Sequence, residues 1–161
     1  MNRLLRIALP GLLAIAAGAP AQADFGGKDD VIELTQVECQ FLESENGVNH
    51  DFESASKADC QTINKRTGDE RLDNHKVLRL EPGTYTFKVT NKDVPYTLGF
   101  WLREKGYDPG SSVDKLTKTS VSGGGLDAGE TDTYEVELEP GEYVYSCPLN
   151  PTPNYRLVVE G

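Results

Sequence analysis

Three cysteines and two histidines are the side chains of this sequence best suited to redox or metal chemistry. The cysteines are Cys39, Cys60 and Cys147, and the histidines are His50 and His75. Thiolates and imidazoles are the ligands that copper and other soft or borderline transition metals prefer. Because three is an odd number, one internal disulfide leaves at least one thiol unpaired. The cysteines therefore predict either a disulfide with a free thiol or a thiolate site for a metal ion.

Three arrangements of the cysteines remain open at this point. A Cys39–Cys60 disulfide closes a short loop, for which chain entropy predicts roughly 3 kcal/mol of stabilisation, and leaves Cys147 free. A Cys39–Cys147 disulfide is the alternative pairing. In the third arrangement, two or three thiolates hold a soft metal such as Cu(I). The candidate metal ligands are Cys147, Cys39, His50 and His75, and the other role for a free Cys147 is that of a buried, inert thiol.

The N-terminal residues predict export from the cytoplasm. A short basic start precedes an apolar run over residues 7–17 and an Ala-x-Ala site that ends at Ala23. This order is typical of a cleaved secretory signal, and the apolar run is too short to span a bilayer. We therefore expect residues 1–23 to be a signal peptide and residues 24–161 to fold as one domain. The predicted location is the periplasm, where disulfides persist.

The expected mature chain is strongly acidic. The full sequence has 16 Lys and Arg against 26 Asp and Glu, a formal charge of −10, and the signal removes two basic residues and no acidic ones, which leaves −12. This excess of negative charge disfavours nucleic acid and anionic lipid and favours cations and basic partners. No later apolar stretch is long enough to cross a membrane. We expect a monomer with no nucleic-acid partner and no membrane span after signal removal.

Period-two alternation of apolar residues recurs along the chain and predicts strands. It is found over residues 76–80, 84–91, 134–139, 143–147 and 155–159. Residues 31–39, which are rich in β-branched and apolar side chains, and the apolar and aromatic run 96–102 also read as strands. Many short strands divided by Gly and Pro indicate an antiparallel sandwich of about seven or eight strands. A polar insertion over about residues 42–75 follows the first strand, with a short helix expected at 54–66 that stops at Gly68. Residues 105–125 are predicted to be a long loop with one short strand near 118–121.

The C-terminal part of the sequence resembles the cupredoxin family. GEYVYSCP at positions 141–148, followed by the strand at 155–159, resembles the final hairpin of that family. PGTYTFKVTN at 82–91 resembles an earlier strand pair, and GLDAGET at 125–131 resembles the turn before the penultimate strands. The resemblance implies an all-β, Greek-key β-sandwich with Cys147 at the position of the blue-copper thiolate.

The other ligands of a blue-copper centre are missing from the positions that the resemblance implies. Such a centre needs one thiolate, two imidazoles and usually a weak axial Met. Tyr96 stands near the position of the first His, and residues 148–154 contain neither His nor Met. An ordinary type 1 copper site is therefore not expected.

The position of Cys39 indicates a closer relative. LTQVEC at 34–39 and the hairpin that ends at Cys147 look like the EfeO-type cupredoxin-like domain of periplasmic ferrous-iron uptake proteins. In that domain, cysteines and acidic residues are the proposed metal ligands. The resemblance implies copper or iron as the metal ion and a periplasmic or inner-membrane metal-handling protein as a partner. Where that family has glutamates, this chain has Leu98, Gly99 and Phe100.

Two functions follow from these observations. The first is a periplasmic cupredoxin-like protein that binds or delivers a transition metal, copper or iron, through a cysteine-containing site. The alternative is a metal-free cupredoxin-like interaction module with a structural disulfide. No nucleophile–base pair, phosphate-binding glycine motif or HExxH motif is present, and we expect no enzymatic activity.

Overall fold

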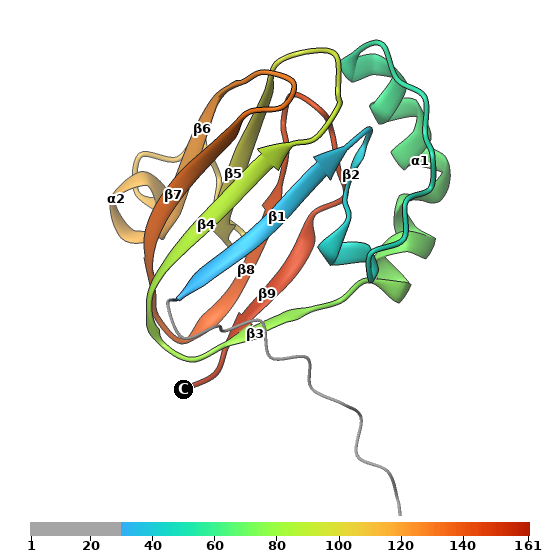
Figure 1. Cartoon of the computed structure of the whole chain (residues 1–161). Coiled ribbons are helices and arrows are strands. Elements are labelled where there is room, and N and C mark those ends of the chain that lie inside the picture. Colours follow the sequence, from blue (N-terminus) through green and yellow to red (C-terminus); the bar gives the residue numbers. More distant parts are fainter. Residues whose placement is uncertain (1–29) are drawn as a thin grey trace, which may run out of the picture.

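Nine strands, one long helix and two short helical turns make up residues 30–161, the part of the chain that the structure, a computed structural model, describes (Figure 1). The predicted signal peptide lies outside these residues. The strands are β1 Val31–Val37, β2 Gln40–Phe41, β3 Leu78–Leu80, β4 Gly83–Asn91, β5 Leu98–Glu104, β6 Ser120–Leu126, β7 Thr131–Leu138, β8 Gly141–Ser146 and β9 Tyr155–Val159. The helical elements are η1 Glu43–Glu45, α1 Lys57–Asn74 and α2 Asp114–Thr117.

The strands form two sheets that pack face to face. One sheet has the strand order β2-β1-β4-β7, and the other has the order β3-β9-β8-β5-β6. Along β4, the side chains of Tyr85, Phe87 and Val89 are buried while the residues between them are not, as the period-two pattern predicts. The predicted all-β sandwich is confirmed.

Two strand pairings are parallel, although the sequence predicts an antiparallel sandwich. β1 pairs in parallel with β4, and β3 pairs in parallel with β9. Parallel neighbours need a long connection between them. Here the chain leaves β1 through β2 and α1, passes through β3 in the other sheet, and then returns as β4. The polar insertion is thus part of the crossover that makes the first pairing parallel.

Aromatic rings fill much of the space between the sheets. Phe41 lies 6.3 Å from Phe100 and 5.9 Å from Tyr145, measured between ring centroids. Tyr145 in turn lies 5.6 Å from Tyr155. All four side chains are completely buried. Because Phe41 belongs to the two-residue β2, the start of the insertion is anchored in the core before the chain leaves the sheet.

The glycine-rich end of the predicted 105–125 loop is a strand. Residues 120–126 form β6, which pairs antiparallel with β5. A Cβ on Gly123 would lie 2.4 Å from a ring carbon of Tyr134, and a Cβ on Gly99 would lie 2.6 Å from the carbonyl oxygen of Gly123. The glycines therefore allow close packing within a strand, and the loop prediction was wrong at this point.

The helix of the insertion is longer than predicted. The helix was expected over residues 54–66, whereas α1 begins at Lys57, continues past Gly68 and ends at Asn74. Gly68 is buried inside the helix and does not terminate it. Arg71, one turn further on, is also buried and donates hydrogen bonds to the Glu45 carboxylate in η1 and to the carbonyl of Cys39 beside β1. These tertiary contacts outweigh the weak helix propensity of glycine.

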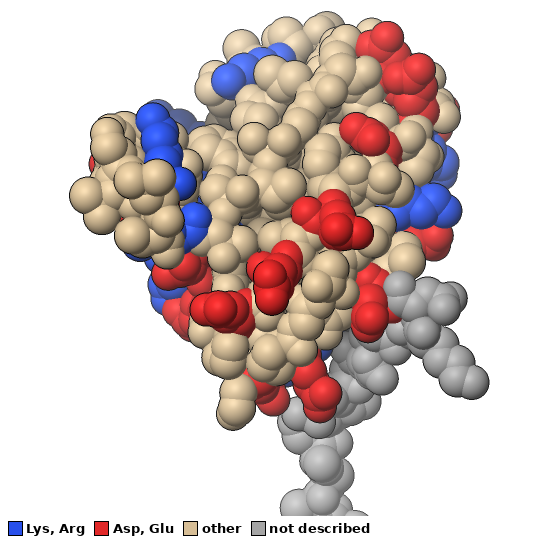
Figure 2. Space-filling view, turned by 90° about the vertical axis from the view of Figure 1, so that its left-hand side faces the viewer, with Lys and Arg blue, Asp and Glu red and all other residues tan. Residues whose placement is uncertain are grey.

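The outer surface carries the negative charge expected from the composition. Figure 2 shows acidic side chains along the side of the molecule on which β6, β7 and α2 lie. Asp132, Glu135 and Glu137 are exposed residues of β7, and Glu139 follows them. Within residues 30–161, no helix is long and apolar enough to cross a membrane.

Candidate functional site

The disulfide joins Cys39 to Cys60, with their Cα atoms 5.0 Å apart. This pairing was the first of the three predicted arrangements, and it leaves Cys147 as a free, buried thiol. Cys39 lies in the turn between β1 and β2, and Cys60 lies in the first turn of α1. The disulfide therefore attaches the insertion helix to the end of the sandwich.

Cys147 follows the last residue of β8 and is only 2% exposed. Its sulfur accepts backbone N–H groups from Gly99 at 3.4 Å and from Asn150 at 3.1 Å. Burial raises the pKa of the thiol, and the backbone hydrogen bonds act in the opposite direction without cancelling that effect. Without a metal, Cys147 is therefore a protonated thiol at neutral pH.

Asn150 lies between the free thiol and the disulfide. In addition to its N–H contact with Cys147, its Oδ1 accepts the N–H of Cys39 at 2.8 Å, and its Nδ2 donates to the carbonyl of Val37 at 2.8 Å. The same Oδ1 lies 3.1 Å from the sulfur of Cys60. Because an oxidised sulfur has no proton to donate, this last approach is a van der Waals contact. One residue thus touches all three cysteines.

Tyr96 completes this hydrogen-bond network. Its hydroxyl donates to Asn150 Oδ1 at 3.0 Å and shares a 2.8 Å hydrogen bond with the hydroxyl of Ser54. Burial raises the pKa of Tyr96, so that the phenol stays protonated at neutral pH. Tyr96 and Asn150 are the residues that the sequence places near the missing copper ligands, and the structure shows both of them committed to protein contacts.

The two histidines have other partners. His50 Nε2 lies 2.6 Å from a carboxylate oxygen of Glu45, and the imidazole stacks on Phe52. His75 hydrogen-bonds through Nδ1 to the carbonyl of Leu72, and its Nε2 accepts the N–H of Arg156. In the described part of the chain, no group of three or more His, Cys, Asp or Glu residues is placed to hold a metal ion. These residues do not fit a type 1 copper.

A buried ion pair between Glu45 and Arg71 lies next to this region. Arg71 Nη2 is 2.6 Å from Glu45 Oε1, and the side chains are 5% and 4% exposed. Tyr155 and His50 also hydrogen-bond to the Glu45 carboxylate. Burial by itself would raise the pKa of Glu45, but the hydrogen bonds from Arg71 and Tyr155 outweigh it and lower that pKa. Glu45 is therefore an ionised, buried carboxylate at neutral pH.

Arg71 connects the pair to the disulfide and to the insertion loop. Its Nη2 donates to the carbonyl of Cys39 at 2.8 Å, and its Nη1 donates to Asn64 Oδ1 at 2.7 Å. The guanidinium carbon lies 4.9 Å from the centroid of the Phe52 ring, within the range of a cation–π contact. The helix is thus held by a disulfide and a charged hydrogen-bond network, since few apolar side chains of α1 are buried.

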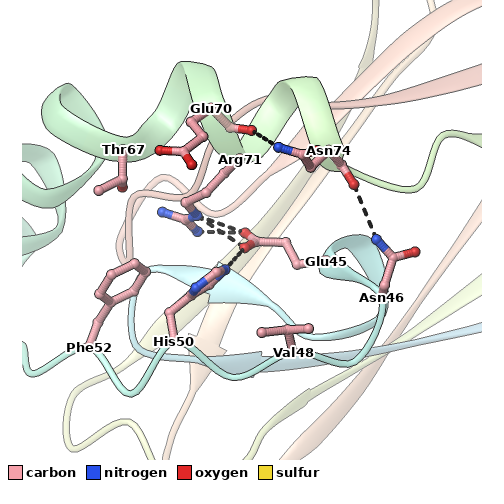
Figure 3. A pocket seen from close by; sticks show the side chains of 9 residues that line it. All are labelled: Glu45, Asn46, Val48, His50, Phe52, Thr67, Glu70, Arg71 and Asn74. Atoms are coloured by element: carbon pink, nitrogen blue, oxygen red, sulfur yellow. Dashed lines mark hydrogen bonds and ion pairs between the residues drawn. The ribbon is translucent and has the colours of Figure 1, made fainter.

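A cavity of about 300 Å³ opens beside the ion pair, between α1 and the preceding loop (Figure 3). We call it the insertion pocket. Its helix wall is Thr67, Glu70, Arg71 and Asn74, and its loop wall is Glu45, Asn46, Val48, His50 and Phe52. The residues of this pocket were not among the candidate site residues predicted from the sequence, apart from His50. The spacing i, i+3, i+4, i+7 of the helix residues is the available signal, because it places polar side chains on one helix face.

Comparison with known proteins adds little to these observations. No family model matches the sequence, and no curated protein sequence matches it significantly. Among solved structures, the crystal structure of Fet3p, described as a multicopper oxidase that functions in iron import, aligns with a TM-score of 0.41 at 17% identity. The alignment covers 94% of this chain and 37% of that structure. At this level the match carries no information about activity, and the sandwich rests on the strand topology described above.

Proposed function

We propose that the protein is a periplasmic cupredoxin-like protein that binds Cu(I) through Cys39, Cys60 and Cys147 when its disulfide is reduced. The observation that carries the proposal is Asn150, whose atoms contact Cys147 on one side and both disulfide cysteines on the other. In the oxidised structure these cysteines are not placed as a metal site. Once the disulfide is reduced and the Asn150 side chain moves from between them, the three thiols would supply the soft donors that suit Cu(I). Iron is the other metal that the sequence resemblance implies.

Reduction of the Cys39–Cys60 disulfide needs a dithiol reductant. Its two thiols give two electrons and two protons to the Cys39–Cys60 bond, which becomes two thiols, while the reductant becomes a disulfide. Binding of Cu(I) by the three thiols then releases their protons to water. Loss of the metal followed by oxidation restores the structure described above. A periplasmic or inner-membrane metal-handling protein is the expected source or acceptor of the ion.

The environment of Cys147 supports a thiolate once a metal is bound. The N–H groups of Gly99 and Asn150 point at its sulfur and stabilise negative charge there. The three cysteines are also almost completely buried, which keeps water away from a bound ion. Neither histidine is required in this site.

A titration of residues 24–161 tests the proposal. Oxidised protein should show one free thiol, and phosphine-reduced, anaerobic protein should show three. The reduced form should withdraw one equivalent of Cu(I) from a coloured chelator, and the oxidised form and reduced Cys147→Ala should withdraw much less. Parallel titrations with Cu(II) and Fe(II) identify the metal. If reduced wild type and reduced Cys147→Ala compete equally for all three ions, the metal site does not exist.

The second candidate function is a metal-free interaction module with a structural disulfide. It is favoured by Tyr96 and Asn150, which are fully engaged in hydrogen bonds near the positions where relatives hold metal ligands. This function predicts that reduction yields no metal affinity. It also predicts that purified protein from the periplasm carries the disulfide and no stoichiometric metal, which thiol counting and elemental analysis measure together.

A further inference from the structure

The insertion pocket has an excess of hydrogen-bond acceptors. Thr67 Oγ1 donates to the carbonyl of Ile63, and Asn74 Nδ2 donates to the carbonyl of Glu70. Asn46 Nδ2 donates to the carbonyl of Asn74. The Thr67 hydroxyl and one N–H of each amide are therefore used on the protein itself, which leaves one N–H on each amide. The amide oxygens of Asn46 and Asn74, with two lone pairs each, carry no hydrogen bond from residues 30–161. A ligand in this pocket meets mainly acceptors.

The charge of the pocket is also unbalanced. Arg71 and Glu45 neutralise each other at 2.6 Å. The carboxylate of Glu70 lies on the same helix face and forms no ion pair with any residue of the described chain. Figure 3 shows Glu70 on the helix side of the cavity, opposite Phe52 and His50 on the loop. One uncompensated carboxylate thus borders a cavity that is rich in acceptors.

The remaining wall is apolar. Val48 is 51% exposed, and the Phe52 ring lines the cavity 4.9 Å from the Arg71 guanidinium carbon. An aliphatic chain that covered these two side chains would remove apolar surface from water, which favours binding. The volume of about 300 Å³ lies at the lower end of the range for small-molecule sites.

From these three properties we infer that the insertion pocket binds a primary ammonium group on an aliphatic stem. An ammonium group has three donors and no acceptor, which matches a pocket that offers acceptors. Its positive charge pairs with Glu70, and its stem covers Val48 and Phe52. The same chemistry is supplied by a free alkylamine or by a lysine side chain of a basic partner, and the acidic surface attracts either one.

The test is an NMR titration of the oxidised protein with two probes, n-butylammonium and an N-acetyl-lysine methylamide, and with n-butanol as the uncharged analogue. We expect amide shifts that cluster at Val48, Phe52, Glu70 and Asn74 and that saturate for at least one ammonium probe. Glu70→Gln should weaken that binding by roughly tenfold, the loss expected for one charged hydrogen bond. Binding of both probes indicates a general ammonium site, and binding of the lysine probe alone indicates a partner's side chain.

Asp73→Asn is the matched control, because it removes the same charge from an exposed position of α1 outside the pocket lining. It should leave the affinity within about twofold of wild type. Equal weakening by Glu70→Gln and Asp73→Asn would show a diffuse charge effect and overturn the inference. Equal affinity for n-butanol, or no saturable shift with either ammonium probe, would overturn it as well. Cysteine variants do not enter this test, so its result is independent of the metal proposal.

Discussion

Arg71 is a residue whose loss we expect to be costly. Its side chain is buried, and it is paired with the buried carboxylate of Glu45. Arg71→Ala leaves that carboxylate uncompensated, and the expected loss in the free energy of unfolding is about 3–5 kcal/mol. Arg66→Ala, at an exposed position of the same helix, is the control and should cost less than about 0.5 kcal/mol. Urea unfolding followed by circular dichroism measures both variants.

Glu45 should also make stability depend on pH. Its pKa is lowered in the folded protein from a reference value of 4.5. A carboxyl group with a lowered folded pKa contributes stability that is complete above 4.5 and is lost as pH falls through the folded pKa. Wild type should therefore lose more stability between pH 6 and pH 3 than Glu45→Gln does. Urea unfolding at these pH values measures the two free energies of unfolding. An equal loss of free energy for wild type and Glu45→Gln between pH 6 and pH 3 would contradict this assignment.

At the scale of residues, the sequence revealed the cysteines but not the ion pair. The odd cysteine count predicted either one disulfide with a free thiol or a thiolate metal site, and the structure has the disulfide and the free thiol. Glu45 and Arg71 are 26 positions apart in a polar segment with no periodic pattern. Their contact depends on how α1 lies against the sandwich, which local sequence does not encode. The four predicted metal ligands do not form one cluster, because each histidine has partners in its own surroundings.

At the scale of elements, Gly123 in β6 should not tolerate a side chain. A Cβ at this position would lie 2.4 Å from a ring carbon of Tyr134. Gly123→Ala forces the ring or the strand to move, at an expected cost of about 1–3 kcal/mol. Gly124→Ala is the matched control in the same strand, because its nearest contacts would be ordinary ones at 3.7 and 3.8 Å. Thermal unfolding of the two variants should separate them; equal melting temperatures would show that Tyr134 moves freely.

The attachment of α1 is expected to depend on the disulfide. The helix buries few apolar side chains, so the Cys39–Cys60 bond and the Arg71 network hold most of it in place. Cys60→Ser should remove roughly 3 kcal/mol of loop-closure stabilisation and accelerate hydrogen exchange along α1 while β4 stays protected. Cys147→Ser, which leaves the disulfide intact, is the control. If hydrogen exchange in Cys60→Ser accelerated in β4 as much as in α1, the disulfide would stabilise the whole sandwich and not only the attachment of α1.

The errors in the predicted helix and strand boundaries have a common physical cause. Strands with regular apolar alternation, such as β4 and β7, were located to within a few residues because one face of each is buried. The glycine-rich part of β6 was missed, beyond the short strand predicted near 118–121, because Gly123 is required by the Tyr134 ring, which belongs to another strand. α1 was cut short at Gly68 because the contacts that extend it are made by Arg71 to the sandwich. In both cases tertiary contact outweighed local propensity.

At the scale of the whole molecule, α1 connects the two candidate sites. Through Cys60 it reaches the sulfur-rich end of the sandwich, and through Glu70 and Arg71 it forms one wall of the insertion pocket. Arg71 also donates to the carbonyl of Cys39, so the pocket wall and the disulfide share a hydrogen bond. A change in the redox state of the cysteines should therefore reach the pocket through the position of the helix.

This connection predicts a measurable coupling between reduction and ammonium binding. If reduction loosens α1, the reduced protein should bind n-butylammonium at least about fivefold more weakly than the oxidised protein, within the usual range of coupling energies. Because coupling between two equilibria is reciprocal, saturating n-butylammonium should make the disulfide harder to reduce by the same factor in a dithiol redox buffer. NMR titrations give the first factor and thiol counting across the buffer series gives the second. Equal affinity for n-butylammonium in the two redox states would show that the pocket and the cysteines are not coupled. It would also mean that α1 keeps its position without the disulfide.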